Sequence, residues 1–203
     1  TGWLRSARLG GVPTLMKFEA QLADRRFGET TVVIPVPPTP VSLPIAVQSQ
    51  RFEGRVSWLY VRNGLGFGPY AGMQFFRSAY QETEVLVLFL DTAILSAMVG
   101  LETEWRSSNW VLSTRAGYLA PAFISQAPFN SGEGSGEGFQ VQAEGIVDIT
   151  RSLGIYTRFN LNRLRLDYVG AGTHRDPVSN EDYDRARQLD RHVDVSLGIQ
   201  FSL

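Results

Sequence analysis

Few side chains in this chain could do acid–base or nucleophilic chemistry. Its 203 residues include two histidines and no cysteine, which excludes thiolate metal sites, disulfides and cysteine nucleophiles. One spacing is suggestive: His192 and Asp194 are two residues apart, so in an extended strand they share a face and the carboxylate could orient the imidazole. No second acidic pair for activating water can be assigned, and His174 has no distinctive partner. A hydrogen-bonded interior histidine is therefore the simpler interpretation of His192.

Composition narrows the function classes further. The chain carries 19 Lys and Arg against 20 Asp and Glu, and it has no basic run, so nucleic acid is not an expected partner. The Gly134-Ser-Gly-Glu-Gly138 segment lacks the Lys-Ser/Thr ending and the following helix of a phosphate-binding loop. We expect no catalytic residue, no cofactor and no metal site.

The elements that would position any site are long strands. Along the last residues, every second side chain is apolar and those between are small or polar, so that odd and even positions (the two parities) differ in character. The apolar parity is Val193, Val195, Leu197, Ile199, Phe201 and Leu203. Such alternation indicates a strand with one apolar face. Strands of soluble proteins usually run about 5 to 6 residues, whereas a tilted strand needs about 9 to 11 to cross a bilayer. The length favours a membrane-crossing strand.

The same alternation recurs upstream and defines the links between strands. Alternating segments occur at 16–22, 52–60, 95–105, 110–118, 139–149 and 153–161, with a weaker candidate at 69–80. The links alternate between long (25–50, about 81–93, 120–137, 169–189) and short (63–68, 106–109, 149–152). Long and short links alternate in this way in transmembrane barrels. The sequence predicts an all-β, closed, antiparallel up-and-down transmembrane β-barrel with eight strands, ten being possible.

Aromatic residues lie where such a barrel would meet the membrane interfaces. Most are close to the tight turns or the chain end, and two lie near the other rim. This expected aromatic girdle comprises Trp58, Tyr60, Trp105, Trp110, Tyr118, Tyr168 and Phe201.

On these residues the chain resembles the small eight-stranded outer-membrane barrel proteins of Gram-negative bacteria, the class that includes the OmpA membrane domain, OmpX and OmpW. The alternating segment Val193 to Leu203 is similar to the C-terminal signal read by the barrel assembly machinery, and Gly100-Leu-Glu-Thr-Glu-Trp-Arg-Ser-Ser-Asn-Trp110 is typical of a barrel hairpin. The family usually ends in Phe or Trp, whereas here the last residue is Leu203.

The resemblance implies a location and partners. Residues 1–13 would be an N-terminal periplasmic segment and 14–203 the outer-membrane barrel domain, with periplasmic termini and extracellular long loops. Expected partners are the lipid bilayer and lipopolysaccharide, the barrel assembly machinery during biogenesis, and another envelope protein.

If the apolar parity faces lipid, the opposite parity places charges in the lumen. This expected lumen charge network comprises Lys17, Glu19, Glu53, Arg55, Glu102, Glu104, Arg106, Arg115, Glu144, Asp148, Arg158 and Asp194. Side chains fill an eight-stranded barrel, and unpaired buried ions are costly, so the charges should pair across the interior. We expect a non-conducting, non-enzymatic barrel that serves as a membrane anchor and as a structural or binding component, acting through its loops or outer surface.

Alternatives remain at this stage. A soluble barrel would also alternate, with its apolar parity inward. Residues 85–101 could be a transmembrane helix, although Asp91 and the strand-like parity oppose it; otherwise Val85 to Leu90 could be a partner surface. Among outer-membrane barrels, there are two alternative functions. One is an enzyme, either a protease or a lipid-modifying barrel, that uses His192 and Asp194, as omptin proteases use an Asp/His arrangement. The other is a small OmpW-like transporter of apolar molecules.

Overall fold

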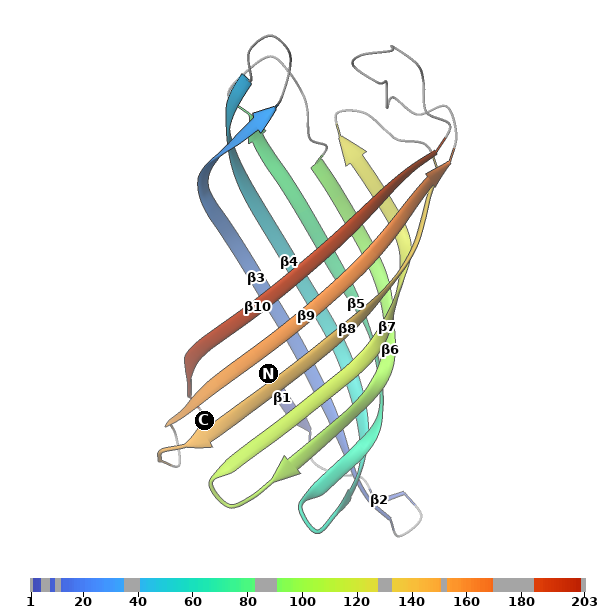
Figure 1. Ribbon diagram of the computed structural model, residues 1–203. Coiled ribbons are helices and arrows are strands. Elements are labelled where there is room, and N and C mark those ends of the chain that lie inside the picture. Colours follow the sequence, from blue (N-terminus) through green and yellow to red (C-terminus); the bar gives the residue numbers. More distant parts are fainter. Residues whose placement is uncertain are drawn as a thin grey trace.

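The computed structural model describes residues 2–4, 8–9, 12–34, 41–82, 91–127, 133–150, 153–169 and 185–201 (Figure 1). These residues form eight long antiparallel strands in one curled sheet, with two short strands near the N-terminus. The part of the chain described here contains no helix that could span a membrane. The strands are β1 (Gly2–Leu4), β2 (Arg8–Leu9), β3 (Val12–Ile34), β4 (Val41–Arg62), β5 (Leu65–Glu82), β6 (Asp91–Arg106), β7 (Trp110–Ala127), β8 (Glu133–Asp148), β9 (Leu153–Val169) and β10 (Arg185–Phe201).

The long strands pair in chain order from β3 to β10, which confirms the all-β up-and-down fold. Short turns lie together at one end of the sheet, at the bottom of Figure 1. The tightest is Asn63-Gly64, where both residues have positive φ (51° and 80°), the backbone that a two-residue hairpin needs. A Cβ on Gly64 would lie 2.6 Å from the carbonyl oxygen of Arg106, which is closer than van der Waals contact allows. Glycine is therefore required at this position.

The strands are longer than the sequence indicated. β3 runs to Ile34 and β4 starts at Val41, so the expected long link over 25–50 is wrong, and β7 and β8 likewise take up most of 120–137. The weak candidate at 69–80 is the middle of β5. Asp91 to Leu101 lies in β6, which contradicts the transmembrane helix; residues 83–90, with the expected partner surface, lie outside the described residues.

The two outer edges of the sheet differ from the expected closure. No ladder joins β10 to β3 among the described residues, so the sheet is a half-barrel. Instead, β1 pairs with the outer edge of β3, with Gly2 opposite Phe18 and Leu4 opposite Met16. The N-terminal strand therefore occupies part of the edge that a closing strand would use.

The two faces of the sheet have opposite character. Side chains of the apolar parity point outward: Val195 is 79% exposed and Leu197 is 74% exposed. Charged side chains of the other parity point inward, where Glu102 and Lys17 are almost fully buried. This is the reverse of a soluble barrel, in which the apolar parity lines the interior.

Towards the long-link ends of the strands, this polarity inverts. Inside, an apolar cluster forms from Ile94, Leu164, Leu166 and Tyr168, with Phe76 and Ile124 packed against it. Outside, at the same level of β9, the side chains are Arg163, Arg165 and Asp167. The sheet thus has a lower part with an apolar exterior and an upper part with an apolar interior.

Candidate functional site: an interior charge cluster and a polar rim

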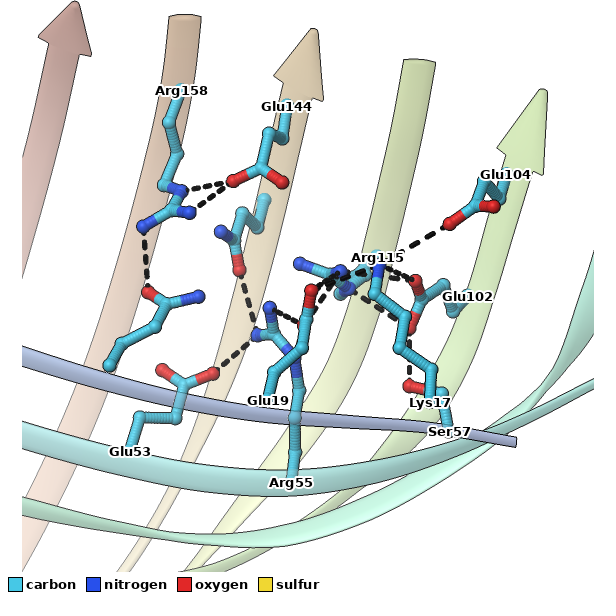
Figure 2. A network of polar contacts seen from close by, with 12 residues as sticks. Lys17, Glu19, Glu53, Arg55, Ser57, Glu102, Glu104, Arg115, Glu144 and Arg158 are labelled. Atoms are coloured by element: carbon cyan, nitrogen blue, oxygen red, sulfur yellow. Dashed lines mark hydrogen bonds and ion pairs between the residues drawn. The ribbon is translucent and has the colours of Figure 1, made fainter. Parts of the chain in front are cut away.

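The concave face of the lower sheet holds a cluster of buried charges (Figure 2). Eight of the twelve expected lumen charges are buried, and we call these the interior charge cluster: Lys17, Glu19, Glu53, Arg55, Glu102, Glu104, Arg115 and Glu144. They come from β3, β4, β6, β7 and β8. The strict period of two in these strands brings them to one face.

At the centre, two cations bridge acids from opposite sides of the interior. The Lys17 Nζ lies 2.9 Å from Glu19 Oε1 and 3.1 Å from Glu102 Oε1. The Arg115 guanidinium lies 2.8 Å from Glu19 Oε2 and 3.0 Å from Glu102 Oε2. Ser57 donates its hydroxyl to Glu102. Because β3 is not a neighbour of β6 or β7 in the sheet, the Lys17–Glu102 and Arg115–Glu19 pairs connect facing walls.

A second group continues the network towards β8, β9 and β10. Arg55 pairs with Glu19 and Glu53, and its Nη1 donates to Gln142 Oε1 at 3.0 Å. Gln140 donates to Glu53 and to Asn160, each at 3.2 Å. Hydrogen bonds from glutamine and asparagine side chains therefore join the ion pairs in connecting strands across the interior.

Four of the expected lumen residues lie at the margins of this cluster. Arg158 is partly buried, pairs with Glu144, and donates to Gln21 of β3 at 3.0 Å. Asp194 is partly buried and accepts from Asn160 at 3.3 Å. Arg106 is exposed while binding Glu104, and Asp148 is exposed beside the turn after β8.

Sequence reasoning missed the uncharged members. Ser57, Gln140, Gln142 and Asn160 are buried and hydrogen-bonded within the network, and Arg51 reaches Glu53 from the same strand. Each lies on the inward parity of its strand. That parity was the available signal, but the uncharged residues on it were not considered, and Arg51 lies just before the alternating segment at 52–60.

His192 and Asp194 lie above the cluster, on one face of β10 as their spacing indicated. The centroid of the His192 ring lies 4.6 Å from that of the Phe76 ring, and the two rings are tilted by 54°. A small cavity of about 20 Å³ beside them is bordered also by Ala23 and Arg51. A cavity of this size holds about one water molecule, so it offers no space for a substrate in the described structure.

The expected girdle divides into outward and inward residues. Trp58, Tyr60, Trp105 and Tyr118 are exposed on the outer face, and Trp110 is half-buried with its ring 5.1 Å from that of Trp105, edge to face. The C-terminal residues Val193, Val195, Leu197 and Ile199 are exposed in the same way. The Phe201 backbone pairs with Leu153, whereas its side chain and all of Leu203 lie outside the described residues.

The prediction that Tyr168 belongs to the outer aromatic girdle is wrong, because its side chain points inward. It is 3% exposed, and its hydroxyl bonds Gln126 at 3.0 Å and Gln188 at 3.1 Å. The parity of β9 explains this: with Ile155 outward, an even-numbered residue faces the interior. Burial, with the nearby charge of Asp190, raises the pKa of Tyr168 to about 12.

The outer face of the upper sheet is a polar rim. The Arg187 Nε donates to Asp167 at 2.6 Å, and Arg165 Nε lies 3.0 Å from the same carboxylate. The hydrogen bond from Arg187, together with the charges of Arg165 and Arg187, holds the pKa of Asp167 below its usual value. This carboxylate therefore stays ionised and tethers two strands.

Together, fold and site define an eight-stranded, curled antiparallel sheet with a charged, filled interior and an apolar lower exterior. Neither a protein-family model nor a curated protein sequence matches this chain. The described residues contain no group of three or more His, Cys, Asp or Glu side chains that could hold a metal ion.

Proposed function

We propose that this protein is an integral β-barrel of the bacterial outer membrane that acts, without catalysis, as an anchor and as a structural or binding component of the envelope. The supporting observation is the polarity of the lower sheet, with apolar residues exposed outside and paired charges buried inside. Water would penalise that exterior, because contiguous apolar patches of this kind are rare on soluble monomers. A bilayer would favour it.

The outward side chains form a band whose limits are readable from the ladders. Four consecutive rows across β7 to β10 are apolar apart from two threonines: Trp110, Val147, Ile155, Ile199; Leu112, Gly145, Thr157, Leu197; Thr114, Ala143, Phe159, Val195; and Ala116, Val141, Leu161, Val193. The next row is Tyr118, Phe139, Arg163 and Arg191. From Ile155 to Arg163 is about 26 Å along the strand. We place the hydrocarbon layer at this apolar band.

A membrane location requires the open edges to pair, since lipid offers no hydrogen bonds to a free strand edge. The register is suggested by Leu22 of β3 and Val195 of β10, whose exposures of 80% and 79% exceed those of the other large outward side chains described. Next to them, Ala23 and Asp194 border the same small cavity. We therefore propose closure with Leu22 opposite Val195. In that register, β1 occupies the part of the β3 edge that Ile199 to Phe201 would take.

The filled interior supports an anchor more than a channel. The cross-wall contacts of Lys17 with Glu102, Arg115 with Glu19 and Arg55 with Gln142 occupy the lumen at mid-height. Opening a path would require these buried ion pairs to be separated, and breaking a buried pair costs several kcal/mol. Function would then reside in the outer surface and in the extracellular segments, through which another envelope protein would dock.

Cell fractionation with gel mobility tests the proposal. A protein folded as a barrel should appear in the outer-membrane fraction and migrate faster when the sample is not boiled. Purified protein in planar bilayers should give no stable conductance steps. Recovery in the soluble fraction without a mobility shift would refute the membrane barrel; regular conductance steps would refute the non-conducting interior.

A further inference from the structure

The outer face carries a cavity directly above the apolar band. Its volume is about 320 Å³, and residues from four neighbouring strands line it: Tyr118, Glu137, Phe139, Arg163, Arg165 and Leu189. The lining belongs to two successive rows of the ladder, in which Tyr118, Phe139 and Arg163 are neighbours and Glu137, Arg165 and Leu189 are neighbours. The cavity lining therefore combines apolar and aromatic side chains with two arginines and one carboxylate at one defined level.

Two of the arginines at this level have no anionic partner among the residues that the structure describes. Arg163 and Arg191 are directly opposite each other in the β9–β10 ladder and both are exposed. Neither makes an ion pair with another residue of the described ranges. Like charges directly opposite one another destabilise a sheet. An anion bound between the two guanidinium groups would remove this repulsion.

The neighbouring charges favour an anion at that position. The described outward side chains of this rim carry four cations, Arg163, Arg165, Arg187 and Arg191, against two carboxylates, Glu137 and Asp167. Asp167 is already bound by Arg165 and Arg187. Glu137 is opposite Arg165, one row away from Arg163. The uncompensated positive charge is therefore centred on Arg163 and Arg191.

The surroundings of the two arginines indicate a ligand that is also apolar. In the same row, Tyr118 and Phe139 are exposed aromatic rings, and aromatic rings favour the level of lipid headgroups. The row below, with Val141, Leu161 and Val193, is apolar and faces outward. Arginine binds phosphate through two parallel hydrogen bonds, and a chain attached to that phosphate would lie along this row.

We propose that this cavity, together with Arg191 beside it, forms a binding site for a phosphate-bearing lipid, with the phosphate held between the cavity-lining Arg163 and its ladder partner Arg191 and an acyl chain lying over Val141, Leu161 and Val193. This inference rests on the proposed function, because the acyl chain belongs in the bilayer. It adds a ligand class and a defined position to a barrel otherwise described as an anchor.

Native mass spectrometry of the protein released from neutral detergent micelles tests the site. With dioleoyl phosphatidic acid as the probe, one lipid should be retained per chain, and dioleoyl phosphatidylcholine should be retained much less. Replacing Arg163→Gln and Arg191→Gln together should weaken retention by about fivefold per arginine, the ratio that corresponds to about 1 kcal/mol for one basic side chain at an anionic lipid surface. The double lysine variant should retain most of the binding.

A matched control is Arg77→Gln. Arg77 is also an exposed arginine near the upper end of a strand, but it lies on β5 and has Asp91 4.0 Å away. Its replacement should leave retention unchanged. Equal retention by the double glutamine variant would overturn the site, as would an equal loss in the control. Competition by millimolar inorganic phosphate as effective as by the lipid would show a free-anion site and overturn the lipid assignment.

Insertion of the same preparation into phosphatidylcholine vesicles, measured by flotation and protease protection, separates the two proposals. Failure to insert would refute the proposed function and the lipid site with it. Insertion without preference for phosphatidic acid would refute the lipid site alone. Heat-modifiable mobility of each variant shows that it is folded.

Discussion

A single charged substitution in the apolar band distinguishes a lipid-facing surface from a water-facing one by the sign of its effect. Val195 lies in the third of the four apolar rows and is 79% exposed, so an arginine there meets no steric obstacle. In a bilayer, Val195→Arg should lower the free energy of unfolding by about 2 to 4 kcal/mol, the cost of arginine near the midplane of a barrel. That cost corresponds to a change of about 30- to 700-fold in the folding equilibrium. In water, the same change on an exposed site would be within about 0.5 kcal/mol of neutral.

The assay is urea-dependent folding into phosphatidylcholine vesicles, followed by tryptophan fluorescence and gel mobility. Ile149→Arg is the matched control, because Ile149 is 57% exposed but lies in the turn after β8, outside the band. It should cost no more than about 1 kcal/mol, as for charges near an interface. If the two variants have equal stability, or if Val195→Arg is the more stable, the assignment of this face to lipid is refuted.

Three further predictions concern the proposed closure between β3 and β10, the interior charge cluster and the buried Tyr168. Because the chain has no cysteine, the double variant Leu22→Cys with Val195→Cys should form an intramolecular disulfide in the folded barrel, visible as a change in gel mobility without reductant. The control pair, Leu22→Cys with Ile199→Cys, should form no disulfide. The reverse result would refute the proposed register. Glu102→Gln leaves Lys17 and Arg115 short of an anion in a buried site and should lower the free energy of unfolding by about 3 to 5 kcal/mol; a loss below 1 kcal/mol in urea titrations would contradict the pairing. Tyr168, with a pKa raised to about 12 from 10.0, favours folding below about pH 10, and this contribution is lost between pH 10 and 12. In titrations followed by absorbance at 295 nm, Tyr168→Phe should remove one tyrosine from the late-ionising part of the curve, and an unchanged late part would contradict the burial of Tyr168.

Much of the fold was readable because strands impose a period of two. The alternation at 193–203, 139–149 and 153–161 predicted β10, β8 and β9, and the short turns at 63–68, 106–109 and 149–152 are where chain reversals occur. The same rule placed Lys17, Glu53 and Glu102 on one side of the sheet. Local backbone geometry alone carries this information, so no knowledge of the other strands was needed.

The upper parts of the strands were misjudged for a physical reason. Above the apolar band, the polar and apolar residues exchange faces of the sheet, as between Leu161 and Leu164 on β9. A search for alternation in which the apolar residues always lie on the same face fails at that level. It therefore predicts a loop where the strand continues. This exchange also explains why Tyr168 was assigned to the outer girdle, although it packs inside with Ile94 and Leu166.

By itself, the sequence determined the strand class, the order of the strands and which side chains share a face, because these depend on neighbours along the chain. Only the tertiary structure decided that the apolar face is the outer one, that Lys17 reaches Glu102 and Arg115 reaches Glu19 across the interior, and that β1 lies on the edge of β3. Curling a sheet in either direction satisfies the same alternation. Which face becomes the inner one depends on contacts between strands far apart in sequence, because the burial of side chains and the pairing of charges over the whole sheet together decide which way it curls.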